Sequence, residues 1–209
     1  MAWADMAFSP VTGLRDTATY AAKPVSETAA REQIQGRLDE VRDYVNASVN
    51  KWSIIETKTL VANAAQVDFT SISTDWIFLK LLFTLKSTTD TNRDLNVNFN
   101  DNVTANKTTV VSKLLAASIT PSGFSADTFF PLPEALPSNS SYPSNGEILI
   151  NNAASYNSLI ANYVVHGVAL AGYSVNGVFN GTGHVTKLNL IASGDNIKAG
   201  SSFILMGVK

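Results

Sequence analysis

The 209-residue chain contains no cysteine. This absence excludes disulfide bonds, thiolate metal sites, iron–sulfur clusters and cysteine nucleophiles together. Only two histidines are present, so the chain has few of the side chains that most often act as general bases. We therefore expect a fold that depends on neither oxidising nor reducing conditions, and a protein that holds no metal and no other cofactor.

Charged residues are also scarce. Lys, Arg, Asp and Glu make up 15% of the chain and leave a net charge of −2, whereas about a quarter of an average globular sequence is charged. A near-neutral chain lacks the basic stripe that binds nucleic acid, so we expect no nucleic-acid partner. Asn, Ser and Thr supply the polar surface instead. The hydrophobic share of 45% can fill a core, which excludes wholesale disorder.

No hydrophobic run is long enough to cross a membrane. The longest apolar stretch, Trp76 to Leu85, is interrupted by Lys80 and Thr84, and a spanning helix needs about 20 apolar residues. The first residues, Met1 to Met6, lack the basic region and apolar run of a signal peptide. We therefore expect neither a signal peptide nor membrane insertion.

The first zone of the chain, residues 1–25, is predicted to be an extended arm. It follows neither a helical nor a strand period, and Pro10, Gly13 and Pro24 interrupt it. Such an arm is either a frayed terminus or a segment docked on a partner. Three large apolar side chains favour docking, so we predict that they anchor the arm: Trp3, Met6 and Phe8.

Residues 26–52 are predicted to form a helix with a narrow apolar seam. Ser26 or Thr28 can cap its first turn. Apolar residues then recur at alternating spacings of four and three, with one serine among them: Ile34, Leu38, Val41, Val45, Ser48 and Trp52. This spacing is typical of a coiled coil, whereas a helix packed on a large core has a wider apolar face. The alternative is an amphipathic helix packed on its own chain.

Residues 53–209 have the pattern of an antiparallel β-sandwich or jelly roll, because short strand signals follow one another without alternating helices. Strands are predicted at 76–86, 95–100, 147–151, 163–170, 184–191 and 202–208. Hairpin turns are predicted at Asn145-Gly146, Asn176-Gly177, Asn180-Gly181 and 194–196. Residues 108–117 form either a short helix or a strand, and the proline-rich stretch 124–143 is predicted to be a long loop.

Signals of catalysis are poor, so we do not expect an enzyme. His166 and His184 lie in strand patterns, and no Gly-x-Ser-x-Gly motif is present. The last 100 residues hold four carboxylates, which are widely spaced: Asp127, Glu134, Glu147 and Asp195. No metal-binding spacing occurs, although a histidine on a symmetry axis needs no motif to bind an ion.

Four tyrosines lie among Asn and Ser residues in the C-terminal zone: Tyr142, Tyr156, Tyr163 and Tyr173. Aromatic rings together with amide and hydroxyl groups suit neutral ligands such as sugars. The alternative is that these tyrosines make cross-strand pairs in a sheet surface that carries little charge.

Three segments resemble those of bacteriophage fibre and appendage proteins. They are the arm motif Gly13-Leu14-Arg15-Asp16, the helix from Ser26 to Asn46 with its Ala-Arg-x-Gln-Ile-Gln core, and the ending from Ile197 to Val208. In that ending, Met206 stands where a tyrosine is common. The resemblance covers most of the chain in general plan, and its specific motifs cover some 35 residues, none of them catalytic.

The resemblance implies a homotrimer on the virion, assembled in the host cytoplasm. The arm (1–25) would attach to other virion structural proteins, the helices (26–52) would form a trimeric coiled coil, and the β domains (53–209) would form a head. The first hypothesis is an adhesive appendage whose head binds a host cell-surface polysaccharide. The second is a capsid or head-decoration protein that only stabilises the particle. The third, which the scarcity of acids and histidines disfavours, is a hydrolase of surface polymer.

Overall fold

The computed structural model describes residues 34–41, 52–115, 118–138, 142–155, 157–166 and 170–209. The chain divides into two compact units, 1–51 and 52–209. The described part of the first unit, residues 34–41, is helical. The predicted arm 1–25, with Trp3, Met6 and Phe8, lies outside the described residues, as does Val45.

The described part of the second unit is built from twelve strands. They are β1 (Ser53–Thr59), β2 (Gln66–Phe69), β3 (Phe78–Leu85), β4 (Arg93–Phe99), β5 (Lys107–Leu115), β6 (Ser118–Asp127), β7 (Phe130–Leu136), β8 (Ser144–Asn152), β9 (Asn157–His166), β10 (Leu170–Phe179), β11 (Leu188–Ala192) and β12 (Ser202–Val208).

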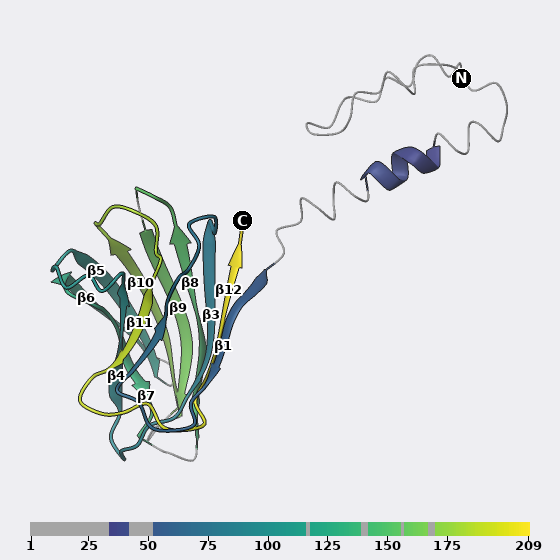
Figure 1. The fold of residues 1–209 in the computed structure, drawn as a ribbon. Coiled ribbons are helices and arrows are strands. Elements are labelled where there is room, and N and C mark those ends of the chain that lie inside the picture. Colours follow the sequence, from purple (N-terminus) through teal and green to yellow (C-terminus); the bar gives the residue numbers. More distant parts are fainter. Residues whose placement is uncertain (1–33, 42–51, 116–117, 139–141, 156, 167–169) are drawn as a thin grey trace, which may run out of the picture. The chain divides into compact units, whose positions relative to one another are not determined.

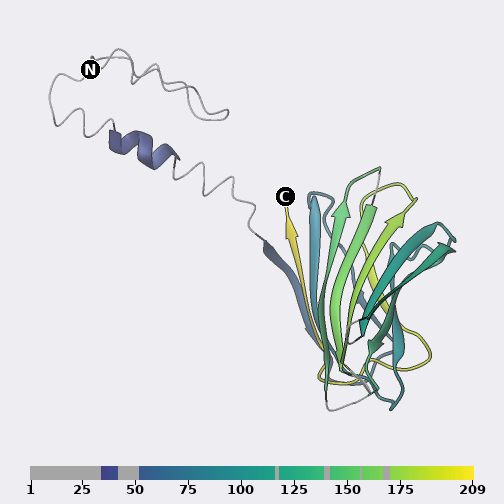
Figure 2. The same ribbon diagram turned by 180° about the vertical axis from the view of Figure 1, so that it is seen from behind.

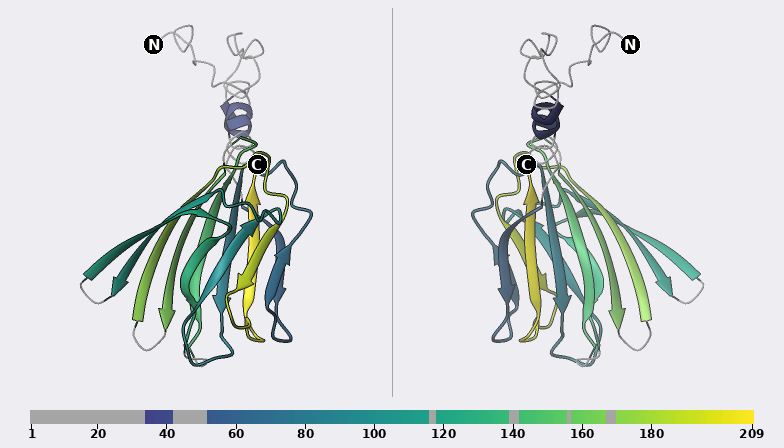
Figure 3. Two further views of the ribbon diagram at one scale, coloured as in Figure 1. Left: turned by 90° about the vertical axis from the view of Figure 1, so that its left-hand side faces the viewer. Right: turned by 90° about the vertical axis from the view of Figure 1, so that its right-hand side faces the viewer.

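These strands form two antiparallel sheets, as Figures 1 and 2 show. The large sheet has eight strands in the order β1-β12-β3-β8-β9-β10-β5-β6, and the small sheet has four in the order β2-β11-β4-β7. Figure 3 shows the strands of the large sheet fanning out towards β5 and β6. The second unit is therefore mainly β and antiparallel, consistent with the predicted β-sandwich.

The core lies between the two sheets. In β9, Leu159, Ala161, Tyr163 and Val165 are buried, whereas Ile160, Asn162 and Val164 between them are exposed, because successive side chains of a strand point to opposite faces. Aromatic pairs join the sheets across the core. The Phe69 ring of β2 meets Phe203 of β12 at 6.4 Å, and Phe99 of β4 meets Phe179 of β10 at 5.9 Å.

Apolar alternation and runs of strand-forming residues predicted the strands well. The predictions at 95–100, 147–151 and 202–208 correspond to β4, β8 and β12. Residues 108–117, for which a helix and a strand were both open, belong mostly to β5. Two boundaries were wrong. Residues 163–170 are not one strand, since Leu170 of β10 pairs with His166 of β9. Strand β11 begins only at Leu188, so His184 lies outside it.

Two of the predicted Asn-Gly turns were wrong. Asn145-Gly146 lies inside β8 and Asn176-Gly177 inside β10. These glycines serve close packing. A Cβ on Gly146 would lie 2.3 Å from the Tyr163 Cβ, and a Cβ on Gly177 would lie 2.5 Å from the Phe130 ring. A glycine can therefore mark a turn, or it can mark a place inside a strand where a different segment of the chain packs closely.

The long loop predicted at 124–143 was also wrong, because this stretch contains the end of β6 and the whole of β7. Proline lacks the amide hydrogen that a central strand needs, so prolines in sheets are confined to edges and bulges. β7 pairs with β4 alone and is an edge strand of the small sheet. Pro131 and Pro133 therefore fit within it.

Candidate functional site

The described helix carries an apolar stripe that is about half exposed. Ile34, Leu38 and Val41 are 49%, 57% and 43% exposed. Their spacing of four and three residues places them on one side of a helix. On the rest of the surface, Arg37 pairs with Glu40 at 2.8 Å, and Gln35 donates a hydrogen bond to Asp39 at 3.1 Å. The stripe therefore has the residues and the exposure of an association surface.

Trp52, predicted to end the helical seam, is not helical and directly precedes β1. Its ring lies 5.1 Å from the Nζ atom of Lys80 in β3, a separation at which a cation and an aromatic ring attract each other. The structure thus places Trp52 with the β unit. Of the residues predicted for assembly, Ile34, Leu38 and Val41 share the described helix.

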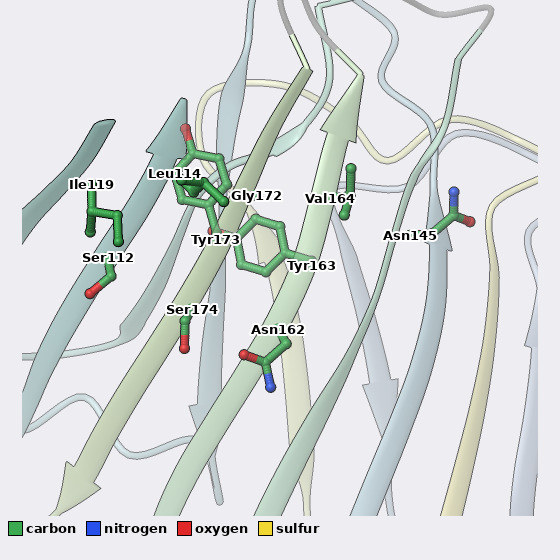
Figure 4. A pocket seen from close by; sticks show the side chains of 10 residues that line it. All are labelled: Ser112, Leu114, Ile119, Asn145, Asn162, Tyr163, Val164, Gly172, Tyr173 and Ser174. Atoms are coloured by element: carbon green, nitrogen blue, oxygen red, sulfur yellow. The ribbon is translucent and has the colours of Figure 1, made fainter. Parts of the chain in front are cut away.

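The outward face of the large sheet contains a shallow depression of about 470 Å³. Figure 4 shows the residues that line it, which come mainly from β5, β9 and β10. It arises because Gly172 pairs with Val164 on one side and with Leu114 on the other, so a position without a side chain separates two aliphatic ones. In the next row, Ser174 and Ser112 are also small.

Two of the tyrosines considered for sugar binding have a packing role. The rings of Tyr163 and Tyr173 stack at 5.0 Å with an angle of 7° between their planes, and both residues are buried. The Tyr163 hydroxyl donates to the Pro133 carbonyl at 2.8 Å. Burial raises the pKa of Tyr163, and burial likewise raises that of Tyr173, to about 12. Both are therefore neutral structural groups near neutral pH.

Tyr142 differs from these two. It is 59% exposed, and its ring stacks against His166 at 6.2 Å. Among the described tyrosines considered for sugar binding, only this one offers a ring to a ligand. Tyr156 lies outside the described residues.

A charged cluster joins the sheets beside the stacked tyrosines. Lys113 of β5 donates to the Glu134 carboxylate of β7 at 2.7 Å, and Asn92 donates to its other oxygen at 3.0 Å. Burial would raise the pKa of Glu134, but the hydrogen bond from Lys113 opposes it and the pKa is lowered. Glu134 has a φ of 54°, and its amide donates to Asp94 at 2.9 Å. With both oxygens bonded, this carboxylate is a structural tie between the sheets.

The remaining candidate catalytic groups lie apart from one another. Glu147 pairs with Lys80 at 3.5 Å, while Asp195 accepts hydrogen bonds from Ser87 and Thr89. His184 Nδ1 lies 2.7 Å from the Asn152 carbonyl oxygen. Within the described residues, no group of three or more His, Asp or Glu side chains is placed to hold a metal ion. Among the described residues, Glu147, Asp195 and His184 are therefore each engaged in a separate contact.

Asp195 ties the β11–β12 connection to residues 87–89. Burial would raise the pKa of its carboxyl, but hydrogen bonds from Thr88, Ser87 and Thr89 and from the backbone of Asn196 lower it to about 2. Because the folded pKa is below the unfolded value, this tie stabilises the protein fully above about pH 4 and is lost as the pH falls through about 2.

Asp195→Asn is expected to lower the free energy of unfolding by about 1–2 kcal/mol at pH 7, because charged acceptors make the stronger hydrogen bonds. The difference from the native protein should shrink towards pH 2. Urea unfolding at pH 7, 4 and 2 measures this. Asp90 is an exposed carboxylate in the same segment, so Asp90→Asn should change the free energy of unfolding little. If the stability lost in Asp195→Asn does not change with pH, the charged Asp195 carboxylate does not stabilise the fold.

The outward face of the large sheet was not among the predictions made from the sequence. A signal was present in β5, where apolar residues occur at both parities: Val110 and Val111, then Leu114 and Leu115. Only one parity can face the core, so the other must present aliphatic side chains elsewhere. Val164 and Val165 in β9 repeat the pattern.

Comparisons of the chain with protein-family models, with curated proteins and with solved structures found no match. Among the described residues, no helix has the length and apolar character needed to cross a membrane. Function has therefore to be inferred from the residues of this chain.

Proposed function

We propose that this protein is a structural appendage of a bacteriophage virion. In this proposal, residues 1–25 attach it to other virion structural proteins, the helix associates three copies, and the β unit is an outward-facing head. The protein is not an enzyme, needs no cofactor, and contacts neither nucleic acid nor the membrane interior.

One observation carries the proposal: a helix outside the β unit exposes Ile34, Leu38 and Val41 along one side. About half of each of these three aliphatic side chains is in water, and burying that part gains about 0.8–1.5 kcal/mol per side chain. A seam of this spacing is buried when two or more copies wind together. The resemblance of the arm, helix and ending to phage appendage proteins favours three copies.

The β unit supports a structural or adhesive role. Its candidate catalytic carboxylates and histidines are engaged in separate contacts, and the exposed ring of Tyr142 beside His166 is suited to stacking on a sugar of a host cell-surface polysaccharide. We do not extend the proposal to a jelly roll, because the strands divide eight and four, whereas that fold has eight strands in two Greek keys.

The test is the solution mass of the full chain by light scattering. The native chain is expected at three times its 22.3 kDa. Leu38→Glu puts a charge in the seam and should give a single chain, because an unpaired carboxylate is costly to bury. Gln35→Glu adds the same charge to an exposed polar position of the same helix and should leave the trimer intact.

A native mass of 22.3 kDa would overturn the proposal, and a dimer would overturn its threefold symmetry. Equal dissociation by Leu38→Glu and Gln35→Glu would show that charge on the helix, rather than the seam, controls association.

A further inference from the structure

The two sheets present very different surfaces to their surroundings. On the small sheet, the buried Asn189 donates to Asp68 at 2.8 Å and to the exposed Asp101 at 3.0 Å, and Lys187 covers Asn189 by pairing with Asp101 at 2.8 Å. This network of charges and amides is typical of a surface that faces water.

The large sheet instead exposes aliphatic side chains over β9, β10, β5 and β6. Their exposed fractions run from 41% to 68%, and they form what we call the aliphatic patch: Val110, Leu114, Ile119, Ile160, Val164 and Leu170. The strand register joins Val164, Leu114 and Ile119 in one row, while Val110 and Ile160 lie two rows away on either side of Asn176. Gly172 pairs with Val164 and Leu114, and Leu114 pairs with Ile119, so one continuous row crosses four strands. Contiguous exposed apolar surface of this kind marks an interaction site.

The chemistry of the patch favours a protein surface over a sugar. Sugars stack on aromatic rings, but the rings of Tyr163 and Tyr173 beneath the depression are buried, and its walls are the aliphatic Leu114, Ile119 and Val164. The exposed Tyr142 ring lies at the edge of this face, beside His166, and does not line the depression. An aliphatic side chain fits a hollow of this composition. Ile119 and Leu170, which are 68% and 62% exposed, are such side chains on the same face.

The charge pattern favours a second copy of this chain as the partner. On the four strands of the patch, none of the described outward-facing residues is Lys, Arg, Asp or Glu. The outward-facing positions are 108, 110, 112, 114, 119, 121, 123, 158, 160, 162, 164, 166, 170, 172, 174, 176 and 178. Around a threefold axis the surfaces nearest the axis meet their own copies, and like charges brought together there are unfavourable. A neutral surface avoids that cost, whereas the Asp68–Asp101 region would not.

We propose that the aliphatic patch is the surface through which the β heads pack on one another around the threefold axis. This inference rests on the proposed trimer and adds the residues that join its heads. Large apolar centres with few charges are characteristic of interfaces between identical subunits.

The cysteine-free chain allows a direct test by thiol reactivity. Val164→Cys puts a single thiol in the patch, and Gln66→Cys puts one on an exposed position of the small sheet as a matched control. Both are made in the full chain, their masses are measured by light scattering, and each is reacted with Ellman's reagent. Ile160→Cys repeats the measurement at a second position of the patch.

If the patch is an interface, the thiols of Val164→Cys and Ile160→Cys should react about tenfold or more slowly than the thiol of Gln66→Cys, because labelling then requires the interface to open. In a Leu38→Glu background, the three thiols should react at similar rates if the mass is that of a single chain. If the heads alone keep the trimer, the two patch thiols should remain slow while the thiol of Gln66→Cys reacts quickly. A trimer in which all three react equally would overturn this inference while leaving the proposed function standing. Slow reaction that persists in the monomer would also overturn it, and a monomeric native chain would overturn the proposed function itself.

Discussion

Gly146→Val is expected to destabilise the β unit by about 3 kcal/mol or more, or to prevent folding. A Cβ at this position would lie 2.3 Å from the Tyr163 Cβ, 2.6 Å from the Asn162 carbonyl oxygen and 2.8 Å from the Phe83 ring. Two of these neighbours are backbone or backbone-attached atoms of β9, which cannot rotate away. The added side chain must therefore push β8 and β9 apart, and overpacking of this kind usually costs about 1–3 kcal/mol even where side chains can adjust.

Urea unfolding followed by circular dichroism measures the effect. Gly172→Ala is the matched control, since it is also a glycine in the large sheet but a Cβ there would meet only Leu114, at 3.9 Å. It should change the unfolding midpoint little. Equal midpoints for Gly146→Val and the native protein would contradict the close approach of β8 and β9 at this point.

Asn152→Leu is the second substitution from which we expect a large effect, a loss of about 2–4 kcal/mol. Asn152 is fully buried at the end of β8. Its side-chain amide donates to the Trp76 carbonyl at 2.9 Å, and its side-chain oxygen accepts from the Val185 amide. Leucine has a similar size but leaves both backbone groups without partners, and each unpaired buried group costs about 1–3 kcal/mol.

Asn151→Leu makes the same chemical change one residue earlier, on the opposite face of β8. Asn151 is half-buried, and no hydrogen bond of its side chain is present among the described residues. The free energy of unfolding of the Asn151→Leu variant should stay within about 0.5 kcal/mol of the native value. If Asn151→Leu and Asn152→Leu lose equal stability, the hydrogen bonds between the Asn152 side chain and the backbone of Trp76 and Val185 do not account for the loss.

The structure shows where reasoning from local pattern succeeds. In β4, apolar residues alternate with polar ones, and Leu95, Val97 and Phe99 are all buried. One face of this strand packs on the core while the other is polar, so the local pattern and the tertiary environment agree. Strand β12 was found from its run of strand-forming residues instead, since Ile204 and Met206 make its other face apolar as well.

Predictions failed where a residue has two uses. Asn-Gly suits a hairpin turn, yet Gly146 and Gly177 lie within strands because an aromatic ring or a neighbouring strand occupies the space of a side chain. Proline breaks central strands, yet β7 is an edge strand and accepts it. Neither neighbour is close in the sequence: Gly177 meets Phe130, and Gly146 meets Phe83.

The amino-acid sequence by itself determined the fold class of this protein, which is mainly β and antiparallel. Composition and alternation predicted an antiparallel β unit with few candidate catalytic groups, and the spacing of Ile34, Leu38 and Val41 predicted an apolar helical stripe. Periodicity is local, so it can be read without knowing which segments meet.

Only the tertiary structure decided which apolar residues are buried. Val164 and Val165 are equivalent in composition, but the small sheet covers one face of β9 and leaves the other open. Likewise, Tyr163 and Tyr173 are stacked in the interior while Tyr142 is exposed. Burial depends on contacts between residues far apart in the chain, and for this reason the aliphatic patch became visible only once the two sheets were in place.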